Sequence, residues 1–260
     1  MEPVRAKKQL GQHFLTDLSI ARRICDALSG SVTPGTLEVG PGMGVLTQFL
    51  KERADLDLYA AEVDRESVDY LIERWPELAP RIISGDFLRL PIAEMFPEGV
   101  NIIGNFPYNI SSQIFFKVLE HRDLVGECVG MVQREVAVRI AEKPGTRDYG
   151  ILSVFLQAYY DIEYLFTVHE NVFSPPPKVK SAVIRLTRNG RQRLDCDEGL
   201  FMRVVKGAFN QRRKTLRNSI RAAFPQVGDR SHEFFALRPE KLGVDEFVEL
   251  TRFVDECLRG

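Results

Sequence analysis

The sequence has little cysteine and tryptophan, and it has no long apolar run. Among 260 residues there are 4 Cys and 1 Trp. No two cysteines form a Cys-x-x-Cys pair, which argues against a metal centre and against a disulfide framework: Cys25, Cys128, Cys196 and Cys257. No apolar stretch approaches the roughly 20 residues of a membrane helix, and the amino-terminal segment lacks the apolar core of a signal peptide. We therefore expect a cytoplasmic protein without membrane contact.

The chain also has almost no net charge, because its formal net charge is −1. Nothing global therefore indicates a nucleic-acid-binding protein, but one segment is locally basic. From Arg203 to Arg221 there are basic residues and no Asp or Glu: Arg203, Lys206, Arg212, Arg213, Lys214, Arg217 and Arg221. A solvated helix face is the alternative, yet such faces usually mix both signs. The segment therefore favours contact with a polyanion.

Short apolar, β-rich runs alternate with helical patterns through the first part of the chain. The expected parallel strands are Thr36–Val39, Leu58–Val63, Arg81–Ser84, Val100–Asn105 and Cys128–Gln133. Ile162–His169 and Ser181–Leu186, separated by a Pro-rich turn, look like a closing antiparallel pair. A helix capped by Thr16 is expected before the first strand. The pattern predicts an α/β fold with a mostly parallel sheet.

The carboxyl-terminal part shows helical periodicity without strand signals. Arg188–Gln192 has the composition of a linker. Beyond it, Leu200–Phe224 and Val244–Leu258 carry apolar residues at helical spacing. We therefore expect a sheet-containing domain over residues 1–190 and a small all-helical domain over residues 191–260.

The most informative stretch is Asn105-Phe106-Pro107-Tyr108, which follows an apolar run that is typical of a buried strand. Ligands bind at the carboxyl ends of strands in open α/β sheets. There Asn105 can hydrogen-bond an exocyclic amine, Pro107 stiffens the backbone, and Tyr108 offers a ring for stacking. Together they would hold an adenine. The alternative is a strand-to-helix turn in which Tyr108 packs on a neighbour.

A glycine-rich turn, Glu38 to Gly44, follows the first expected strand. Glycines such as Gly40 and Gly42 let a cofactor approach the backbone closely. The dinucleotide fingerprint requires a third glycine where this chain has Val45, and Pro41 removes a backbone donor. The turn therefore favours an adenosine-bearing cofactor without phosphates over a dinucleotide.

Acidic residues end the next two expected strands. Glu62 lies where such folds place the acid that binds ribose hydroxyls, and Asp86 can accept from an adenine amino group while Phe87 packs nearby. Each acid alone is more often a loop or cap residue. Their occurrence at successive strand ends favours a site for S-adenosylmethionine.

Six segments resemble, in order, the motif series of ribosomal RNA adenine N6,N6-dimethyltransferases: Gln9–Leu15, Glu38–Gly44, Glu62–Asp64, Gly85–Phe87, Asn105–Tyr108 and Phe173–Ser181. The resemblance implies a Rossmann-like class I methyltransferase domain, a helical carboxyl-terminal domain and S-adenosylmethionine as methyl donor. For the members that act on the small subunit, it also implies the substrate. That substrate is two adjacent adenosines in the 3′-terminal hairpin loop of 16S rRNA, within an immature 30S subunit.

The resemblance also implies roles for individual residues. The family's cofactor contacts fall on six positions: His13, Leu15, Gly40, Glu62, Asp86 and Asn105. Three more residues belong to the same expected pocket: Glu38, Gly42 and Phe87. Tyr108 and Phe173 match the aromatic pair around the target base. Without the resemblance, His13 would be expected at the surface and Phe173 could equally anchor a Pro-rich turn in the core. Phosphate contacts are assigned to Arg212, Arg213, Lys214 and Arg217.

Three other functions remain open from the sequence. A DNA adenine methyltransferase usually has a Pro-Pro pair where this chain has Phe106-Pro107. A large-subunit rRNA methyltransferase of the antibiotic-resistance type shares almost every motif and differs in substrate. A non-catalytic RNA-binding assembly factor could keep the fold, although the Gly-rich, acidic and Asn105 positions are intact. We expect a monomeric enzyme.

Overall fold

The computed structural model describes residues 7, 10–29, 33 and 35–260, and it divides the chain into two units. The sheet unit comprises Met1–Ala137 and Asp161–Arg188, and the helical unit comprises Val138–Tyr160 and Asn189–Gly260. From the sequence we expected a single boundary near residue 190. The structure differs, because residues 138–160 belong to the helical unit and not to the sheet unit. The cause of this difference is the apolar face of α7 (Ile151–Gln157), which packs against α8 and α10, with Phe155 contacting the Phe201 ring at 6.1 Å between centroids.

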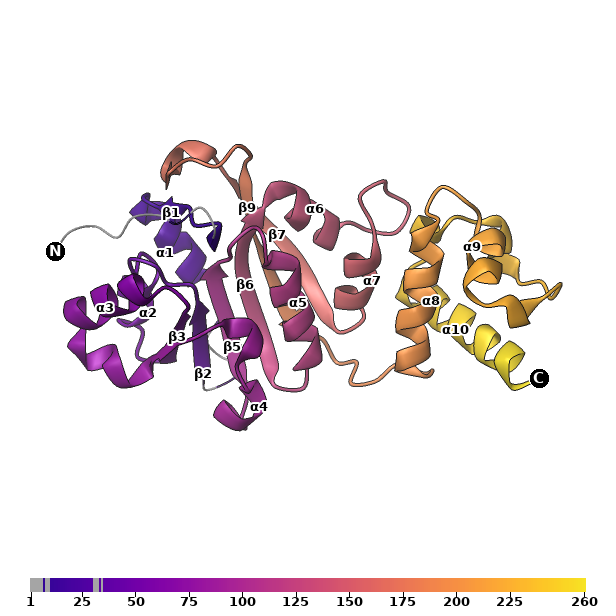
Figure 1. Ribbon diagram of the computed structural model, residues 1–260, viewed down its shortest axis with the longest axis horizontal. Helices are drawn as coiled ribbons and strands as arrows, with labels where there is room; N and C mark the ends of the chain where they lie inside the picture. The colour runs from indigo at the N-terminus through magenta and orange to yellow at the C-terminus, as the bar shows by residue number, and fades with distance from the viewer. Residues whose placement is uncertain (1–6, 8–9, 30–32, 34) are drawn as a thin grey trace. The chain divides into compact units, whose positions relative to one another are not determined.

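The sheet unit is built on one seven-stranded sheet in the order β4-β3-β2-β5-β6-β9-β7 (Figure 1). Its strands are β2 (Gly35–Val39), β3 (Asp57–Glu62), β4 (Ile82–Ser84), β5 (Val100–Asn105), β6 (Val125–Gln133), β7 (Tyr160–Val168) and β9 (Ser181–Arg188). The strands from β4 to β6 are parallel, and β9 runs antiparallel to β6. The predicted α/β fold with a mostly parallel sheet is confirmed.

The strand order reverses at β2 and β5, which are neighbours. From β2 the chain builds the sheet outward through β3 and β4, and from β5 it builds the other way through β6. Right-handed crossovers then place the connecting helices of the two halves on opposite faces. The loops that leave the carboxyl ends of β2 and β5 therefore diverge, and the crevice between them is where such sheets bind ligands.

Helices cover the sheet, and its central strands are buried along almost their whole length. All five residues of β2 are buried, as are the first five of β5, which is expected when both faces of a parallel sheet are covered. The other helices of the sheet unit are α1 (Leu18–Asp26), α2 (Thr47–Leu50), α3 (Arg65–Arg74), α4 (Ile92–Met95) and α5 (Ser111–Glu120). The helix α6 (Arg134–Ala141) leads into the helical unit. On the α1 side, Ile24 and Leu50 belong to a core cluster with Ile103 and Val183 of the sheet.

A two-stranded ladder ties the amino-terminal segment to the Pro-rich segment. Here β1 (Phe14–Leu15) pairs antiparallel with β8 (Phe173–Ser174). The backbone N–H and the hydroxyl of Thr16 both donate to the Val172 carbonyl, at 2.8 and 2.9 Å. Two motifs that are far apart in the sequence therefore lie side by side; Gln9, at the start of the first, lies outside the described residues.

The expected cap of α1 was wrong by one residue. Asp17, not Thr16, is the N-cap, and its carboxylate accepts from the N–H groups of Ser19 at 2.9 Å and Ile20 at 3.2 Å. The Thr16 hydroxyl instead donates a hydrogen bond to the Val172 carbonyl. Both residue types cap helices well, so a partner distant in sequence decided between them.

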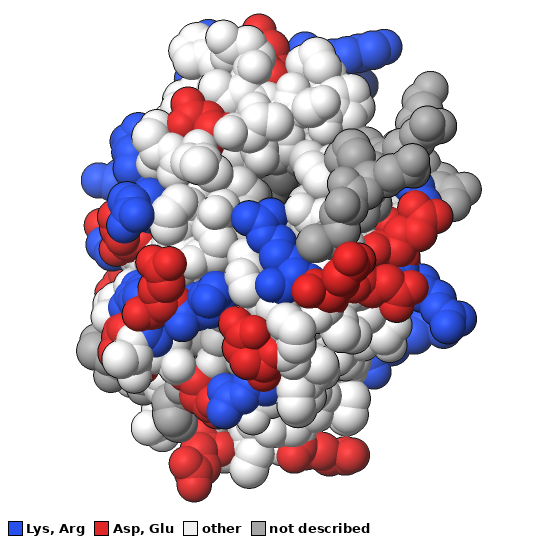
Figure 2. All heavy atoms as spheres, turned by 90° about the vertical axis from the view of Figure 1, so that its left-hand side faces the viewer, with Lys and Arg blue, Asp and Glu red and all other residues white. Residues whose placement is uncertain are grey.

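Charges of both signs are interspersed on the sheet unit. Figure 2 shows Lys and Arg beside Asp and Glu over the face at the left of Figure 1, with no field of one sign. Several of this unit's cations have carboxylate partners, such as Lys51 with Glu77 at 3.5 Å and Arg185 with Glu163 at 2.7 Å. This mixture is typical of a solvated surface rather than of a phosphate-binding one.

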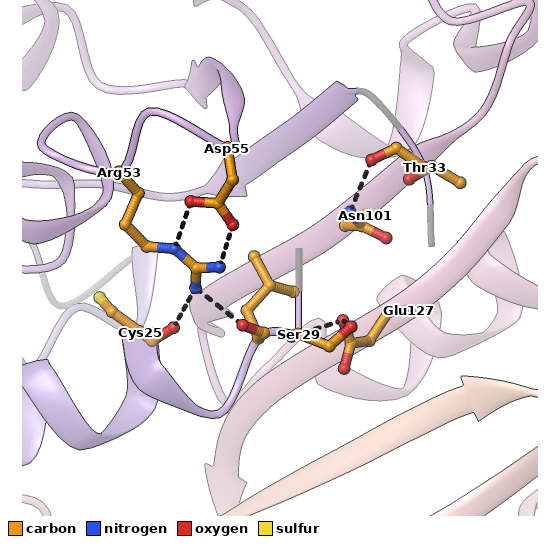
Figure 3. Close-up of polar contacts among 8 residues, drawn as sticks. Cys25, Ser29, Thr33, Arg53, Asp55, Asn101 and Glu127 are labelled. Carbon is orange, nitrogen blue, oxygen red and sulfur yellow. Dashed lines mark hydrogen bonds and ion pairs between the residues drawn. The ribbon is translucent and has the colours of Figure 1, made fainter. Parts of the chain in front are cut away.

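The amino ends of the strands carry structural polar contacts (Figure 3). The Arg53 guanidinium donates to the carbonyls of Cys25 at 3.0 Å and Leu28 at 2.7 Å, which belong to the end of α1 and the turn after it. The N–H and hydroxyl of Ser29 donate to the buried Glu127 carboxylate at 2.9 and 2.8 Å. These bonds satisfy helix-end carbonyls and hold α1 against the sheet, at the edge opposite the sequence motifs.

The helical unit contains α7, α8 (Glu198–Asn210), α9 (Leu216–Ala223) and α10 (Val244–Arg259). Short 3₁₀ helices lie in both units: Pro76–Arg81, Phe87–Arg89, Glu170–Val172, Pro225–Val227, Glu233–Ala236 and Pro239–Lys241. The helical pattern expected over Leu200–Phe224 is broken into α8 and α9 by a turn at residues 211–215. The chain reverses because α9 packs closely on α8 at Gly207, where an added Cβ would lie 2.7 Å from the Ala223 Cβ. None of the described helices has the length and apolarity needed to span a membrane.

We expect Gly44→Ala to lower the free energy of unfolding by about 2–4 kcal/mol. Gly44 has φ +77°, and a Cβ there would lie 2.3 Å from the Trp75 ring. Gly190 is the matched control, because nothing lies within 4 Å of its added Cβ, so Gly190→Ala should stay within about 0.5 kcal/mol of the parent. Urea unfolding of both variants measures the difference, and equal stabilities would contradict the packing argument.

Candidate active site

A cavity of about 220 Å³ opens at the carboxyl edge of the sheet. Ten of the residues predicted from the sequence line it: His13, Gly40, Gly42, Glu62, Asp86, Phe87, Asn105, Phe106, Pro107 and Tyr108. A second cavity of about 360 Å³ shares Phe14, Gly40 and Asn105 with the first, and Leu15 and Glu38 line it. The two cavities therefore adjoin where the β2 and β5 loops diverge, and they bring together segments from across the sheet unit.

The glycine loop presents bare backbone to the cavity. Gly40 and Gly42 have φ values of +68° and +57°, a conformation that favours glycine. A Cβ at Gly40 would find only the Pro107 Cδ, at 4.0 Å, among described atoms, so the space above this residue is open. At Gly42 a Cβ would lie 2.8 Å from the Phe14 ring. Gly40 therefore offers the close approach that a cofactor needs, whereas Gly42 is required by packing.

Glu62 is fixed at the end of β3 by two backbone donors. One oxygen accepts the Gly42 N–H at 3.0 Å and the other accepts the Asp64 N–H at 2.9 Å. Burial raises the pKa of Glu62, and these backbone bonds oppose the rise. The carboxylate thus links the glycine loop to the next strand end and still lines the cavity, where it can accept from a ligand hydroxyl.

Glu38 is nearly fully buried below the glycine loop. Its exposed fraction is 1%, and Thr47 Oγ1 donates to it at 2.6 Å. Burial raises the pKa of Glu38 to about 8; the Thr47 hydrogen bond opposes this rise and the nearby Glu62 charge adds to it. Its place on the wall of the second cavity, rather than the first, distinguishes it from Glu62.

The strand end after β4 supplies an acid and an apolar ring. Asp86 Oδ1 caps the short helix that follows by accepting the Leu88 N–H at 3.0 Å, and Phe87 is buried beside it. Val63, which sequence analysis did not single out, lines the same cavity with 56% of its surface exposed. Its position in the sequence could have indicated this role, because Val63 is an apolar residue directly after Glu62, at the end of a strand.

Asn105 and Tyr108 are oriented by segments distant in sequence. The Asn105 Nδ2 donates to the His13 carbonyl at 2.9 Å, which leaves Oδ1 as an acceptor. The Tyr108 hydroxyl lies 2.5 Å from Ser181 Oγ, and its ring lies 5.3 Å from the His13 ring between centroids. Burial raises the pKa of Tyr108. His13 Nδ1 in turn contacts the Pro175 carbonyl at 2.8 Å, so one network positions the amide and the phenol.

Two predicted aromatic residues have buried rings, although Phe106 also belongs to the lining of the first cavity. The Phe106 ring is 1% exposed, packs on Phe115 at 5.8 Å between centroids, and lies over Gly104 and Gly130, where a Cβ would come within 3.0 and 2.5 Å of it. Phe173 is 4% exposed within the core cluster and does not line either cavity. Phe106 can therefore act through its main chain alone, and the stacking role expected for Phe173 has no support in this conformation. Its alternative, an anchor of the Pro-rich segment, agrees with the structure.

The charge of the first cavity selects among cofactors. Its lining contains the carboxyl groups of Glu62 and Asp86 and, among the described residues, no Lys or Arg. Phosphates would be repelled by this wall, whereas a cationic sulfonium compound would be attracted. An adenosine-bearing cofactor without phosphates fits the acids, the open backbone at Gly40 and the exposed apolar side chain of Val63.

Comparison with known proteins places the chain in a family. A family model described as Ribosomal RNA adenine dimethylase matches residues 4–237. The chain belongs to this family. A protein of Parabacteroides distasonis named Ribosomal RNA small subunit methyltransferase A is 58% identical over 255 residues, covering 96% of this chain and 94% of that protein. A protein of the same name from Porphyromonas gingivalis is 58% identical over 259 residues, covering 98% and 100%.

Solved structures agree with this membership. A dimethyladenosine transferase from Plasmodium falciparum has a TM-score of 0.80 at 21% identity, over 94% of this chain and 98% of the other, and shows the shared fold. The 23S rRNA methyltransferase ErmE has a TM-score of 0.66 at 26% identity, over 93% and 99%. The predicted resemblance is confirmed, and the chain is an enzyme with a class I methyltransferase fold.

We expect the stability contributed by protonated Glu38 to be lost as pH rises. Because the pKa of Glu38 is raised from 4.5 to about 8, the folded protein holds a proton that the unfolded chain has released between those values. The free energy of unfolding should therefore fall through this window, by up to about 1.4 kcal/mol per pH unit.

Glu38→Gln tests this expectation, since Gln keeps an acceptor for Thr47 and has no proton to lose. Urea unfolding at about pH 5.5 and about pH 8.5 should show the variant gaining stability relative to the parent at the higher pH. The exposed Glu73→Gln is the surface control. A parent and a Glu38→Gln variant with parallel pH dependence would contradict the assignment.

Proposed function

We propose that this protein transfers methyl groups from S-adenosylmethionine to N6 of two adjacent adenosines in the 3′-terminal hairpin loop of small-subunit rRNA, within an immature 30S subunit. The observation that carries the proposal is the Asn105 amide oxygen, which no described residue uses as an acceptor, beside a cavity lined by acids and by no described Lys or Arg. The names of the relatives at 58% identity support the small subunit as the source of the RNA.

The residues that would hold the cofactor form both walls of the first cavity. Asp86 and Val63 would contact the adenine of the cofactor, and Glu62 would bind its ribose hydroxyls. The bare main chain at Gly40 would let the cofactor approach closely. Leu15 and Glu38 line the adjoining cavity, which suits the amino-acid end. When bound, S-adenosylmethionine supplies an electrophilic methyl group on a cationic sulfur.

Two oxygens of the Asn105–Pro107 segment are placed to orient an amine. Asn105 Oδ1 accepts no hydrogen bond from a described residue, while Nδ2 donates to the His13 carbonyl at 2.9 Å. The Phe106 carbonyl accepts no hydrogen bond from a described residue, whereas the Pro107 carbonyl accepts the Ile110 N–H at 3.2 Å. If these two oxygens accept the two hydrogens of the adenine N6, the N6 lone pair turns out of conjugation with the ring and toward the methyl donor. Orientation and fixed dipoles then supply the rate gain, without a dedicated base.

Tyr108 is the ring available for the extruded base. Reaching N6 requires the adenine to leave its stack, at a cost of a few kcal/mol that is smaller in a loop. Stacking on an aromatic side chain returns roughly 1–3 kcal/mol per base. The Ser181 contact at 2.5 Å holds the Tyr108 ring at the cavity wall, so the ring is already ordered before substrate arrives.

The two rival functions share the fold: one acts on a different RNA, and the other lacks catalytic activity. A large-subunit target is kept as the second candidate because ErmE, named as a 23S rRNA methyltransferase, superposes over 93% of this chain. A non-catalytic assembly factor would have no need of an oriented amide beside a cavity whose described lining carries acids and no Lys or Arg. The 58% identity to small-subunit methyltransferases favours the first proposal over both.

We expect Tyr108→Ala to lower kcat/KM for RNA methylation about 5- to 150-fold, the equivalent of one lost stacking contact. Tyr108→Phe keeps the ring and loses the hydrogen bond to Ser181, so it should fall less than about tenfold. Titration calorimetry should show donor affinity within about threefold of the parent for both variants. Equal losses of donor affinity and methylation in Tyr108→Ala would count against stacking.

The decisive test of substrate uses small and large subunits that lack the modification. Each is incubated with the protein and labelled donor, and the RNA is digested and its nucleosides identified by mass spectrometry. We expect N6,N6-dimethyladenosine from the terminal hairpin of the small-subunit RNA. Label recovered from large-subunit RNA would favour the second candidate, and donor binding without any transfer would favour an assembly factor.

A further inference from the structure

Arg212, predicted from the sequence as a phosphate contact, is engaged by the protein itself. Its guanidinium donates to the carbonyl of Arg147 and, at 3.0 Å, to the carbonyl of Tyr149. Both carbonyls belong to a loop of the helical unit between α6 and α7, here called the 143–149 loop. Arg212 therefore joins the turn between α8 and α9 to a loop that lies more than sixty positions earlier in the sequence.

Further contacts hold the same loop in place. Gly145 donates its N–H to the Glu240 carbonyl at 2.6 Å, and Lys241 Nζ donates to the Gly145 carbonyl at 3.5 Å. At the end of the loop, Tyr149 is fully buried and its ring lies 6.5 Å from that of Phe209, in the last turn of α8. The loop is thus anchored at its middle and at its end, so its exposed side chains project from an ordered backbone.

The two segments that Arg212 joins carry exposed cations without carboxylate partners. These are Lys143 and Arg147 on the loop, and Arg213, Lys214 and Arg217 on the turn and the start of α9. None of them forms an ion pair with a described residue, whereas Arg191, Arg252 and Arg259 of the same unit pair with Asp245, Asp195 and Asp255. The loop's own acid is Asp148, and Glu142 directly precedes the loop.

We infer that the 143–149 loop and the α8–α9 turn form one composite surface for the phosphate backbone of the RNA substrate, and that Arg212 is the positioning residue that assembles it. The inference rests on the proposed function, which supplies an RNA substrate. Unpaired Arg and Lys side chains on ordered backbone suit phosphates, since guanidinium groups can contact them in bidentate fashion. The interspersed charges of the sheet-unit face in Figure 2 offer no such surface.

The loop's share of the surface is tested by removing its charges. In Lys143→Gln/Arg147→Gln, we expect the slope of log affinity against log salt for small-subunit RNA to flatten by about 0.7–0.9 for each lost contact. Donor affinity should be unchanged, because neither residue lines the cavities. Arg259→Gln is the matched control, an exposed arginine of the same unit whose charge is paired with Asp255 at 2.6 Å.

The positioning role is tested by two charge-conserving variants. Arg212→Lys keeps the charge on a shorter side chain without the Nη2 group that donates to both carbonyls. Hydrogen exchange of the 143–149 amides should therefore accelerate, and RNA affinity should fall about as in the double loop variant. Arg213→Lys should keep both the exchange protection and most of the affinity.

The outcomes separate this inference from the proposed function. If the parent methylates small subunits and the loop variant keeps the parental salt slope, the composite surface is wrong while the function stands. If Arg212→Lys matches Arg213→Lys in exchange and affinity, Arg212 is an ordinary surface cation. A parent that neither binds nor methylates small-subunit RNA overturns the proposed function first.

Discussion

The adjacency of β2 and β5 is the constraint on which the site depends. Because the sheet grows outward from this pair in both directions, the loops after the two strands diverge and leave a crevice at their carboxyl ends. Gly40 leaves one strand and Asn105 ends the other. The bare backbone that can approach a cofactor and the amide that can orient an amine therefore lie at neighbouring points of a rigid edge.

A hydrogen-bonded network built from distant segments completes that edge. The His13 carbonyl fixes the Asn105 amide, His13 Nδ1 contacts the Pro175 carbonyl, and Ser181 holds the Tyr108 hydroxyl. The β1–β8 ladder and the bonds of Thr16 to Val172 keep the participating segments together. Asn105 and Tyr108 are thus held by the segments around His13 and Ser181, which the β1–β8 ladder ties together.

Charge is arranged locally in a protein whose net charge is close to zero. The first cavity has Glu62 and Asp86 and no described cation in its lining, which suits a positively charged donor. The α8–α9 turn and the 143–149 loop carry cations without acid partners, which suits a polyanion. A net charge of −1 conceals both features because opposite local excesses cancel in the sum.

The sequence by itself determined the α/β class, the parallel strands, and the motif residues at their carboxyl ends, because hydrophobic periodicity and turn chemistry are local properties. Tertiary structure alone decided which groups remain free. Asp17 caps α1 because Thr16 binds Val172, Phe106 and Phe173 turn into the core, and Arg212 is occupied by loop carbonyls. These contacts depend on how distant parts of the chain fold together. The type of a residue does not determine which of its possible partners its side chain will contact.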